Sequence, residues 1–169
     1  MQEIPIEELN VKVHDLWLNK WLLLSSGDFK ENDYNSMTVA WGSLGTMWNK
    51  PFAQIVVRPN RHTFGFTEDY DNFTLCTFPE EFRHVLKFMG THSGRDVNKM
   101  EHTGITPVES RIVSSPSFKE ADMILECRKI YFDDIKPDNF IDPSIDENYP
   151  LKDYHRIYFG EILKVFLGE

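Results

Sequence analysis

The residues with the clearest chemical potential lie in a stretch that contains no acid. Residues 35–67 lack aspartate and glutamate, although the chain has 27 acidic and 18 basic residues and a formal net charge of −9. The same stretch carries Lys50, Arg58 and Arg61, and His62 follows the second arginine. Guanidinium and ammonium groups bind phosphate and carboxylate, so this composition indicates an anion site. A buried stretch that avoids charges of either sign is the alternative.

Three polar segments carry side chains suited to a phosphorylated ligand. The first, Asn35 to Gly42, alternates small hydroxyl and amide groups with apolar residues, a mixture that can bind the edge and the face of a flat ring. The second, Arg58 to Thr63, places two arginines, an imidazole and a hydroxyl at a proline turn before an expected helix. The third, Ser93 to Lys99, has a Ser-Gly turn and Asp96 as a candidate N-cap. Taken singly, the first segment also fits an ordinary amphipathic strand, and the third fits a capped helix start.

Other catalytic signatures are absent from the sequence. It contains no G-x-G-x-x-G, G-x-x-x-x-G-K-[ST], H-E-x-x-H or G-x-S-x-G motif, so Rossmann, P-loop, zincin and nucleophile-elbow sites are not predicted. His84, His92 and His102 are too widely spaced to share one helical face, and no metal site is predicted. Cys76 and Cys127 lack the spacing of a redox pair, and we expect them to be buried structural thiols that carry no electrons.

Length and charge limit the class of protein that presents these segments. A chain of 169 residues predicts one domain, residues 1–169. Its acidic balance repels nucleic-acid backbones and anionic lipid surfaces, so no nucleic-acid or membrane partner is expected. No apolar run approaches the roughly 20 residues of a membrane helix. The acidic start MQEIPIEELN is unlike a signal peptide, so a cytoplasmic location is expected.

The secondary-structure pattern predicts an α+β fold dominated by an antiparallel β-barrel. Strands are expected at 21–26, 35–48, 52–57, 73–78, 123–131 and 154–167, the last with a bend or bulge at Gly160. Helices are expected at 6–17, 63–70 and 79–90. Residues 136–150, with three prolines, are predicted to form an extended surface loop. Short strands without regular helix alternation disfavour a doubly wound parallel sheet.

Four segments together resemble the flavin-reductase-like family. NSMTVAWGSLGTMWNKP, VVRPNRHT, SGRDVNK and DYHRIYFGEILKV agree with this family, and especially with its flavoredoxin-like branch, in order and spacing. The resemblance runs from about Trp21 to Val165. It implies the FMN-binding split-barrel fold, with short peripheral helices. Asn98 stands where many relatives have an acid, which leaves the charge at that helix open.

The resemblance also implies a cofactor and the residues that hold it. Proteins of this family are homodimers that bind FMN noncovalently at the subunit interface. By position, the ring and ribityl chain should be bordered by Asn35, Met37, Thr38, Ala40 and Trp41. The phosphate should be surrounded by Arg58, Asn60, Arg61, His62 and Thr63, with Ser93, Gly94 and Lys99 closing the region. No residue receives a firm catalytic role; His155 and Trp41 are candidates for shaping the acceptor side of the flavin.

The implied function is that of an NAD(P)H-dependent flavin reductase-like oxidoreductase. NADH, NADPH or a protein donor would reduce the flavin, which would pass electrons to oxygen, free flavin or a protein acceptor. Hydride transfer depends on stacking two rings more than on a side-chain acid, which agrees with the lack of a catalytic triad. The main alternative is an FMN-binding electron carrier without a nicotinamide site. A barrel that binds another anion or haem is a third, against which Thr38, Arg61 and Lys99 argue.

The aromatic content bears on the oligomeric state. Aromatic residues make up 14% of the chain, and Trp41, Trp48 and Phe52 lie close together in the segment expected to border the flavin. A surface of this kind favours a dimer interface. Filling of the barrel core by the same side chains is the alternative.

Overall fold

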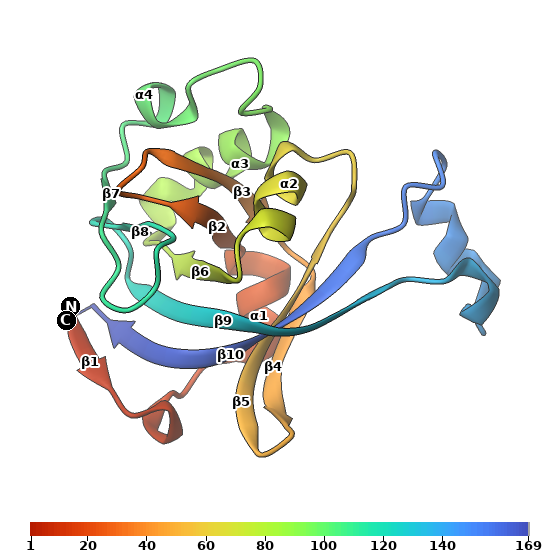
Figure 1. Cartoon of the computed structure of the whole chain (residues 1–169), viewed down its shortest axis with the longest axis horizontal. Coiled ribbons are helices and arrows are strands. Elements are labelled where there is room, and N and C mark those ends of the chain that lie inside the picture. Colours follow the sequence, from red (N-terminus) through yellow and green to blue (C-terminus); the bar gives the residue numbers. More distant parts are fainter. Residues whose placement is uncertain (169) are drawn as a thin grey trace.

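One antiparallel sheet organises the computed structural model, which describes residues 1–168 (Figure 1). Its strands are β1 (Gln2–Ile4), β2 (Leu22–Asp28), β3 (Asp33–Val39), β4 (Gly42–Met47), β5 (Lys50–Val57), β6 (Asn72–Thr77), β9 (Met123–Asp134) and β10 (Arg156–Leu167). They are hydrogen-bonded in the order β3-β2-β6-β9-β10-β5-β4, with β1 on β10. The short strands β7 (Pro107–Val108) and β8 (Ser117–Phe118) pair separately. The predicted α+β class with a dominant antiparallel barrel is confirmed.

The barrel is open between its two edge strands, β3 and β4, which do not pair within residues 1–168. Ala40 and Trp41 alone link them, so the edges meet at one corner, within about 11 Å. The single strand predicted at 35–48 is therefore wrong, because the chain there crosses from one end of the sheet to the other. Gly42 makes the crossing compact: a Cβ atom there would lie 2.4 Å from both the Gln54 carbonyl oxygen and the Trp17 ring.

Two α-helices, α2 (His62–Asp69) and α3 (Arg83–Thr91), pack on β2 and β3, and α4 (Lys99–Thr103) packs on α3. The helix expected from Pro79 is confirmed, although its first turn is the 3₁₀ turn η3 (Glu80–Phe82). The expected N-cap at Asp96 is wrong. Asn98 caps α4 instead, because its side chain accepts a hydrogen bond from the Glu101 amide.

Two further expectations about local structure need correction. The N-terminal helix predicted over 6–17 is broken into η1 (Ile6–Glu8), α1 (Val13–Asp15) and a π-helical turn η2 (Leu16–Lys20), with non-helical backbone between the first two. The loop predicted at 136–150 contains the 3₁₀ segments η4 (Pro137–Asn139) and η5 (Pro143–Asn148). Each of these begins with a proline, whose fixed φ suits the first position of a helix.

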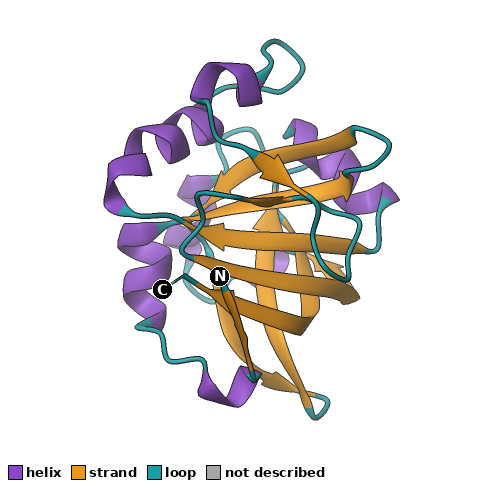
Figure 2. Ribbon diagram, turned by 90° about the vertical axis from the view of Figure 1, so that its left-hand side faces the viewer, coloured by secondary structure: helices purple, strands orange, loops and turns teal. Residues whose placement is uncertain are grey.

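The sheet is covered on both faces, which gives the protein two apolar clusters. Leu22 and Leu24 of β2 point into the barrel, whereas Leu23 packs with α3 on the other face, as strand alternation requires. Figure 2 shows the helices lying beside the curved sheet. Cys127 is in the first cluster and Cys76 in the second, and both are fully buried. No helix within residues 1–168 has the length and apolar character required to cross a bilayer.

Gly160 interrupts β10 as the sequence predicts. The pairing of β10 with β9 shifts register between Phe159 and Gly160, and a Cβ atom at Gly160 would lie 2.3 Å from Cζ of the buried Phe73. The absence of a side chain thus lets the bulged strand lie directly on the barrel core.

Gly160→Ala is expected to lower the free energy of unfolding by about 1–3 kcal/mol, because the new methyl group overpacks the core. Gly65 is the matched control: it lies in α2 with no atom within 4 Å of its potential Cβ, so Gly65→Ala should stabilise by about 0.5–1 kcal/mol. Urea unfolding followed by tryptophan fluorescence measures both. Unchanged stability of Gly160→Ala would contradict the close packing of Phe73 on β10.

Candidate functional site

A hollow of about 440 Å³ opens where β3, the start of α2 and the segment after α3 meet. It brings together most of the residues that the sequence nominated, namely Asn35, Met37, Asn60, Arg61, His62, Thr63, Ser93, Gly94 and Lys99. These residues come from three separate parts of the chain. The two edges of the hollow that carry charge are the turn before α2 and the start of α4.

Arg61 lies at the N-terminal end of α2. The proline turn positions it, since the Arg61 amide donates to the Arg58 carbonyl at 3.0 Å, and Arg61 then serves as the N-cap residue of the helix. Its Nη2 donates to the carbonyl of Gly90 at 2.5 Å, which ties the turn to the end of α3. Burial, and secondly the charge of Arg58, lowers the pKa of the guanidinium. The N-cap side chain makes no capping bond, which leaves first-turn N–H groups for a ligand.

Lys99 is the second cation of the hollow and is almost completely buried. Its Nζ donates to the carbonyls of Ser36 and Met89, each at 3.0 Å, so two of its three N–H bonds are directed into the fold. Burial, and then repulsion by Arg61, lowers the pKa of this ammonium group to about 8. A buried lysine beside an arginine is stable as a charged pair when an anion lies between them.

Neutral polar groups complete the wall next to these cations. Asn35 Nδ2 donates to Thr63 Oγ1 at 2.7 Å, which joins β3 to α2. A Cβ atom at Gly94 would lie 2.3 Å from Asn35 Oδ1 and 3.1 Å from the His62 ring, so the backbone at Gly94 rests directly on both. Burial is the main cause of the lowered pKa of His62, followed by the charges of Arg95 and Lys99. The imidazole is therefore neutral at pH 7 and acts as a hydrogen-bonding group.

Five nominated residues do not line this hollow. Thr38 Oγ1 donates to the Leu86 carbonyl of α3 at 2.5 Å, and Ala40 and Trp41 lie at the corner between β3 and β4. The guanidinium of Arg58 forms an ion pair with Asp153. His155, nominated for the acceptor side, packs its ring 5.3 Å from that of Trp41.

Sequence reasoning did not nominate four residues that do line the hollow: Thr91, His92, Arg95 and Asp96. Arg95 and Asp96 belong to the SGRDVNK motif, and their charges within that motif could have identified them as site residues. Thr91 and His92 lie at the C-terminal end of α3, and only the packing of α3 against β3 brings them here. The ring of His92 stacks on Phe88, and so does that of His102.

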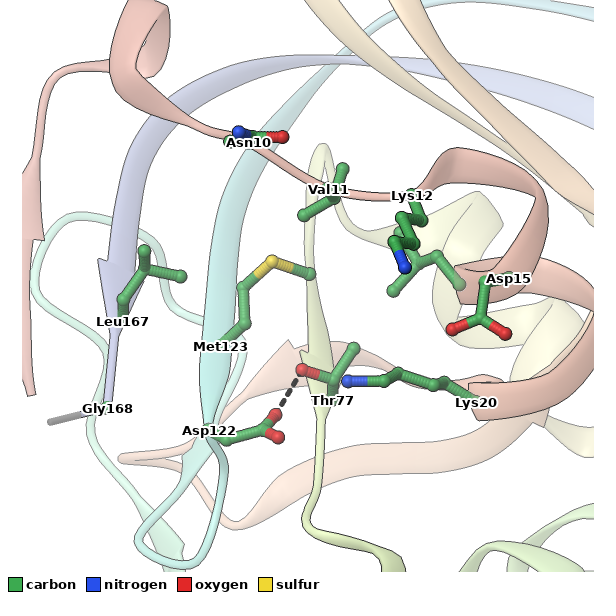
Figure 3. Close-up of a pocket in the computed structure, with 11 residues that line it drawn as sticks. Asn10, Val11, Lys12, Asp15, Lys20, Thr77, Asp122, Met123, Leu167 and Gly168 are labelled. Atoms are coloured by element: carbon green, nitrogen blue, oxygen red, sulfur yellow. Dashed lines mark hydrogen bonds between the residues drawn. The ribbon is translucent and has the colours of Figure 1, made fainter.

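A second hollow, of about 480 Å³, lies between the N-terminal segment and the end of the barrel (Figure 3). Lys12 and Lys20 direct their ammonium groups into it, but Asp15 and Asp122 line it as well. Asp122 accepts a hydrogen bond from Thr77. With cations and carboxylates in equal number, this hollow has no net charge that would attract a phosphate, unlike the hollow at Arg61.

The cysteines lie away from both hollows. Burial raises the pKa of Cys76 to about 12 and that of Cys127 well above its ordinary range. A reactive thiolate needs a cationic, partly exposed setting, and neither side chain has one. Within residues 1–168, no group of three or more histidine, cysteine or acidic side chains is arranged to hold a metal ion.

The arrangement fits a dianionic ligand with a flat apolar part. Arg61 and Lys99 supply charge, α2 supplies N–H groups, and Asn35, Thr63 and Ser93 supply neutral hydrogen bonds. Met37 adds an apolar side chain from β3 to the same wall. A phosphate in this position would neutralise the buried Lys99 and the half-buried Arg61, and Asp96 is the acidic residue that lines the same hollow.

Comparison with known proteins agrees with this geometry. Residues 21–169 match the family described as "Flavin reductase like domain". A curated relative, an uncharacterized protein of Archaeoglobus fulgidus, is 30% identical over 96 residues. That alignment covers 57% of this chain and only 54%, about half, of the relative.

Solved structures share the fold. Flavoredoxin of Desulfovibrio vulgaris superposes with a TM-score of 0.69 at 19% identity, covering 98% of this chain and 78% of its own. An FMN-binding domain of a flavin reductase-like enzyme from Shewanella baltica gives 0.70 at 17%, covering 98% and 76%. An NADH:FAD oxidoreductase of Streptomyces globisporus gives 0.65 at 14%, covering 88% and 75%. At these identities the matches establish the split-barrel fold.

Lys99 is expected to make stability depend on pH. Because its pKa is about 8 in the folded chain and near 10.4 in the unfolded one, the unfolded state binds more protons between these values, and stability rises with pH there. The unfolding free energy of wild type minus that of Lys99→Met should therefore become more positive across this window, by about 3 kcal/mol at most. Urea unfolding at pH 7.5, 9 and 10.5 measures it. A difference that stays constant would contradict a buried, depressed lysine.

Proposed function

The chain belongs to the flavin reductase-like family, and from this premise we propose that it binds FMN with the phosphate in the hollow at Arg61 and Lys99 and works as a flavin-dependent oxidoreductase. Family membership supports a flavin-related oxidoreductase. FMN is the specific ligand proposed because the hollow offers a compact site for one terminal phosphate. We propose that residues 1–169 form a single functional domain.

The observation that carries the proposal is the pair of cations in an otherwise acidic protein. Burial lowers the pKa of both groups; the charge of Arg58 lowers that of Arg61 further, and the charge of Arg61 lowers that of Lys99. Holding both at one site in a chain of net charge −9 is favourable when a dianion neutralises them. A phosphate monoester supplies up to two negative charges and three acceptor oxygens for Arg61, Lys99 and the first turn of α2.

The remaining residues would orient the rest of the ligand. Met37 and the β3–β4 corner at Ala40 and Trp41 form the apolar side along which we place the ring, since Met37 lines the hollow and the corner continues β3. Bound FMN would supply a ring that takes up two electrons with a proton and releases them again, which no side chain can do. The task of the protein is then to fix the ring and to limit access of water.

The electron donor that we propose is NADH or NADPH, and an electron carrier without a nicotinamide site is the second candidate. The NADH:FAD oxidoreductase among the similar structures supports the first candidate by analogy of fold. The flavoredoxin match supports the second in the same way. Anaerobic stopped-flow mixing of the FMN-loaded protein with each nicotinamide separates them, because only the first candidate predicts rapid bleaching of the flavin.

We also propose a homodimer. Trp48 is 54% exposed and lies with Phe52 and Tyr131 around Phe159, whereas Trp41 contacts His155 elsewhere. Trp48 occupies the β4–β5 turn with a φ of 55°, a conformation that is costly for a bulky side chain. A large exposed ring in a turn better suited to glycine or asparagine supports an interface role for this aromatic surface.

The first prediction concerns the phosphate. FMN should bind more tightly than riboflavin, and Arg61→Ala should weaken FMN by about 1.5–3 kcal/mol while leaving riboflavin unchanged. Arg111→Ala is the control, because it removes the same charge from an exposed position outside the hollow. Isothermal titration measures all three proteins. Equal dissociation constants for FMN and riboflavin in the wild type would contradict a phosphate site at Arg61.

The second prediction concerns the oligomer. Wild type should sediment as a dimer at micromolar concentration, and Trp48→Glu should sediment as a monomer, because a carboxylate at the interface cannot be desolvated. Leu18→Glu is the matched control, since Leu18 is 70% exposed in η2 and lies outside the aromatic surface. A monomeric wild type that still holds FMN would rule out the dimer as a requirement for binding.

A further inference from the structure

The segment between β9 and β10 projects from the barrel as an arm, residues 135–155 (Figure 1). Its outer part is not held by apolar burial, because Ile141 is fully exposed and Leu151 is 77% exposed. Phe140, Tyr149 and Tyr154 pack against one another within the arm. Polar contacts tie its base to the turn before α2, and they come from Arg58 and Asn60, two residues that the family resemblance places around the phosphate.

Arg58 holds the base of the arm through three contacts. Its Nη1 donates to Asp153 Oδ1 at 2.9 Å, its Nη2 donates to the Asn148 carbonyl at 2.8 Å, and its guanidinium lies 5.0 Å from the centre of the Tyr149 ring. Asn60 Nδ2 donates to the other carboxylate oxygen of Asp153 at 2.7 Å. The side chains of Arg58 and Asp153 are 26% and 13% exposed, so solvent screens this pair less than a surface ion pair. Arg58 thus directs two of its five N–H donors to the arm.

The arm in turn fixes the protonation state of His155. The hydroxyl of Tyr149, which is 2% exposed, lies 2.9 Å from His155 Nδ1. Burial, and then the charge of Arg58, lowers the pKa of His155 to about 4, so the imidazole is neutral at pH 7. Burial raises the pKa of Tyr149, which keeps its proton. Donation from Tyr149 to Nδ1 satisfies this buried O–H and leaves the hydrogen of the imidazole on Nε2.

His155 is 8% exposed, and its Nε2 is partly accessible to solvent beside an aromatic ring. Within residues 1–168, the one buried side-chain nitrogen or oxygen without a hydrogen-bond partner is Trp17 Nε1. His155 Nε2 has no partner among the same residues, so it must be accessible to solvent. The ring of Trp41, 48% exposed, is 5.3 Å from the imidazole. A half-exposed ring with an N–H donor at its side is suited to a flat ligand that carries a carbonyl or ring nitrogen.

We propose that Arg58 is a positioning residue and not a phosphate ligand: with Asp153 it latches the arm so that Tyr149 holds His155 as an Nε2–H donor beside Trp41. The donor would bind an acceptor atom of a flat aromatic ring. Identifying that ring as the flavin or its redox partner rests on the proposed function, whereas the latch does not.

The test combines NMR of the chain without ligand with binding of FMN. Long-range ¹H–¹⁵N spectra of the six histidines, with His155→Gln to assign the signal, report the tautomer of His155 and its pKa. Wild type should show the Nε2–H form, titrating near pH 4. In Arg58→Gln the pKa should rise toward the ordinary value near 6.5, and amides 148–153 should exchange about tenfold faster. Tyr149→Phe should mix the tautomers.

The measurements of FMN binding distinguish a latch from a phosphate ligand. The ratio of FMN to riboflavin affinity should stay at the wild-type value in Arg58→Gln, whereas Arg61→Ala, the same change of charge, lowers it. A ratio that falls equally in both variants would make Arg58 a phosphate ligand and overturn the proposal. Unchanged His155 spectra and amide exchange in Arg58→Gln would overturn it too. If Arg58→Gln does not fold, Asp153→Asn replaces it, because that change breaks the same ion pair from the side of residues 135–155. Absence of any FMN binding would contradict the proposed function but not the latch.

Discussion

The arrangement of this site depends on two neighbouring cations, the buried Lys99 and the half-buried Arg61, in an acidic protein. Arg61 and Lys99 each lose hydration, and the charge of Arg61 raises the cost of charging Lys99. Carbonyl groups of Gly90, Ser36 and Met89 hold both side chains in place and offset part of that cost. Carbonyl dipoles do not cancel two full charges, so a bound anion would stabilise the pair. The lack of acids in residues 35–67 agrees with such an anion.

The fold supplies these cations from elements that are distant in sequence. α2 begins at the proline turn after β5, α3 ends opposite it, and β3 lies between them as an edge strand of the sheet. The split in the barrel is what leaves β3 free on one side, because the chain crosses at Ala40 and Trp41 to the opposite edge. A closed barrel would pair this edge and remove the hollow. The opening thus serves the site, and the arm latched by Arg58 borders its Trp41 end.

Local sequence signals predicted the strands, the helix after Pro79 and the bulge at Gly160 well, because alternation, proline and glycine act over a few residues. They failed at 35–48, where one alternating segment forms two strands at opposite ends of the sheet, and the crossing between them depends on the close packing of Gly42 on Trp17. Arg58 illustrates the limit at the site. Its charge and position match a phosphate ligand, and the structure pairs it with Asp153, which lies far along the chain. Such long-range pairing has no local signal.

The position of the phosphate tests the central claim most directly. A crystal structure of the FMN-loaded protein should place the phosphorus within hydrogen-bonding reach of Arg61 and the first turn of α2, with Lys99 beside it and Arg58 still paired with Asp153. A phosphate located at Lys12 and Lys20, in the hollow of Figure 3, or bound by Arg58 in place of Asp153, would contradict the account.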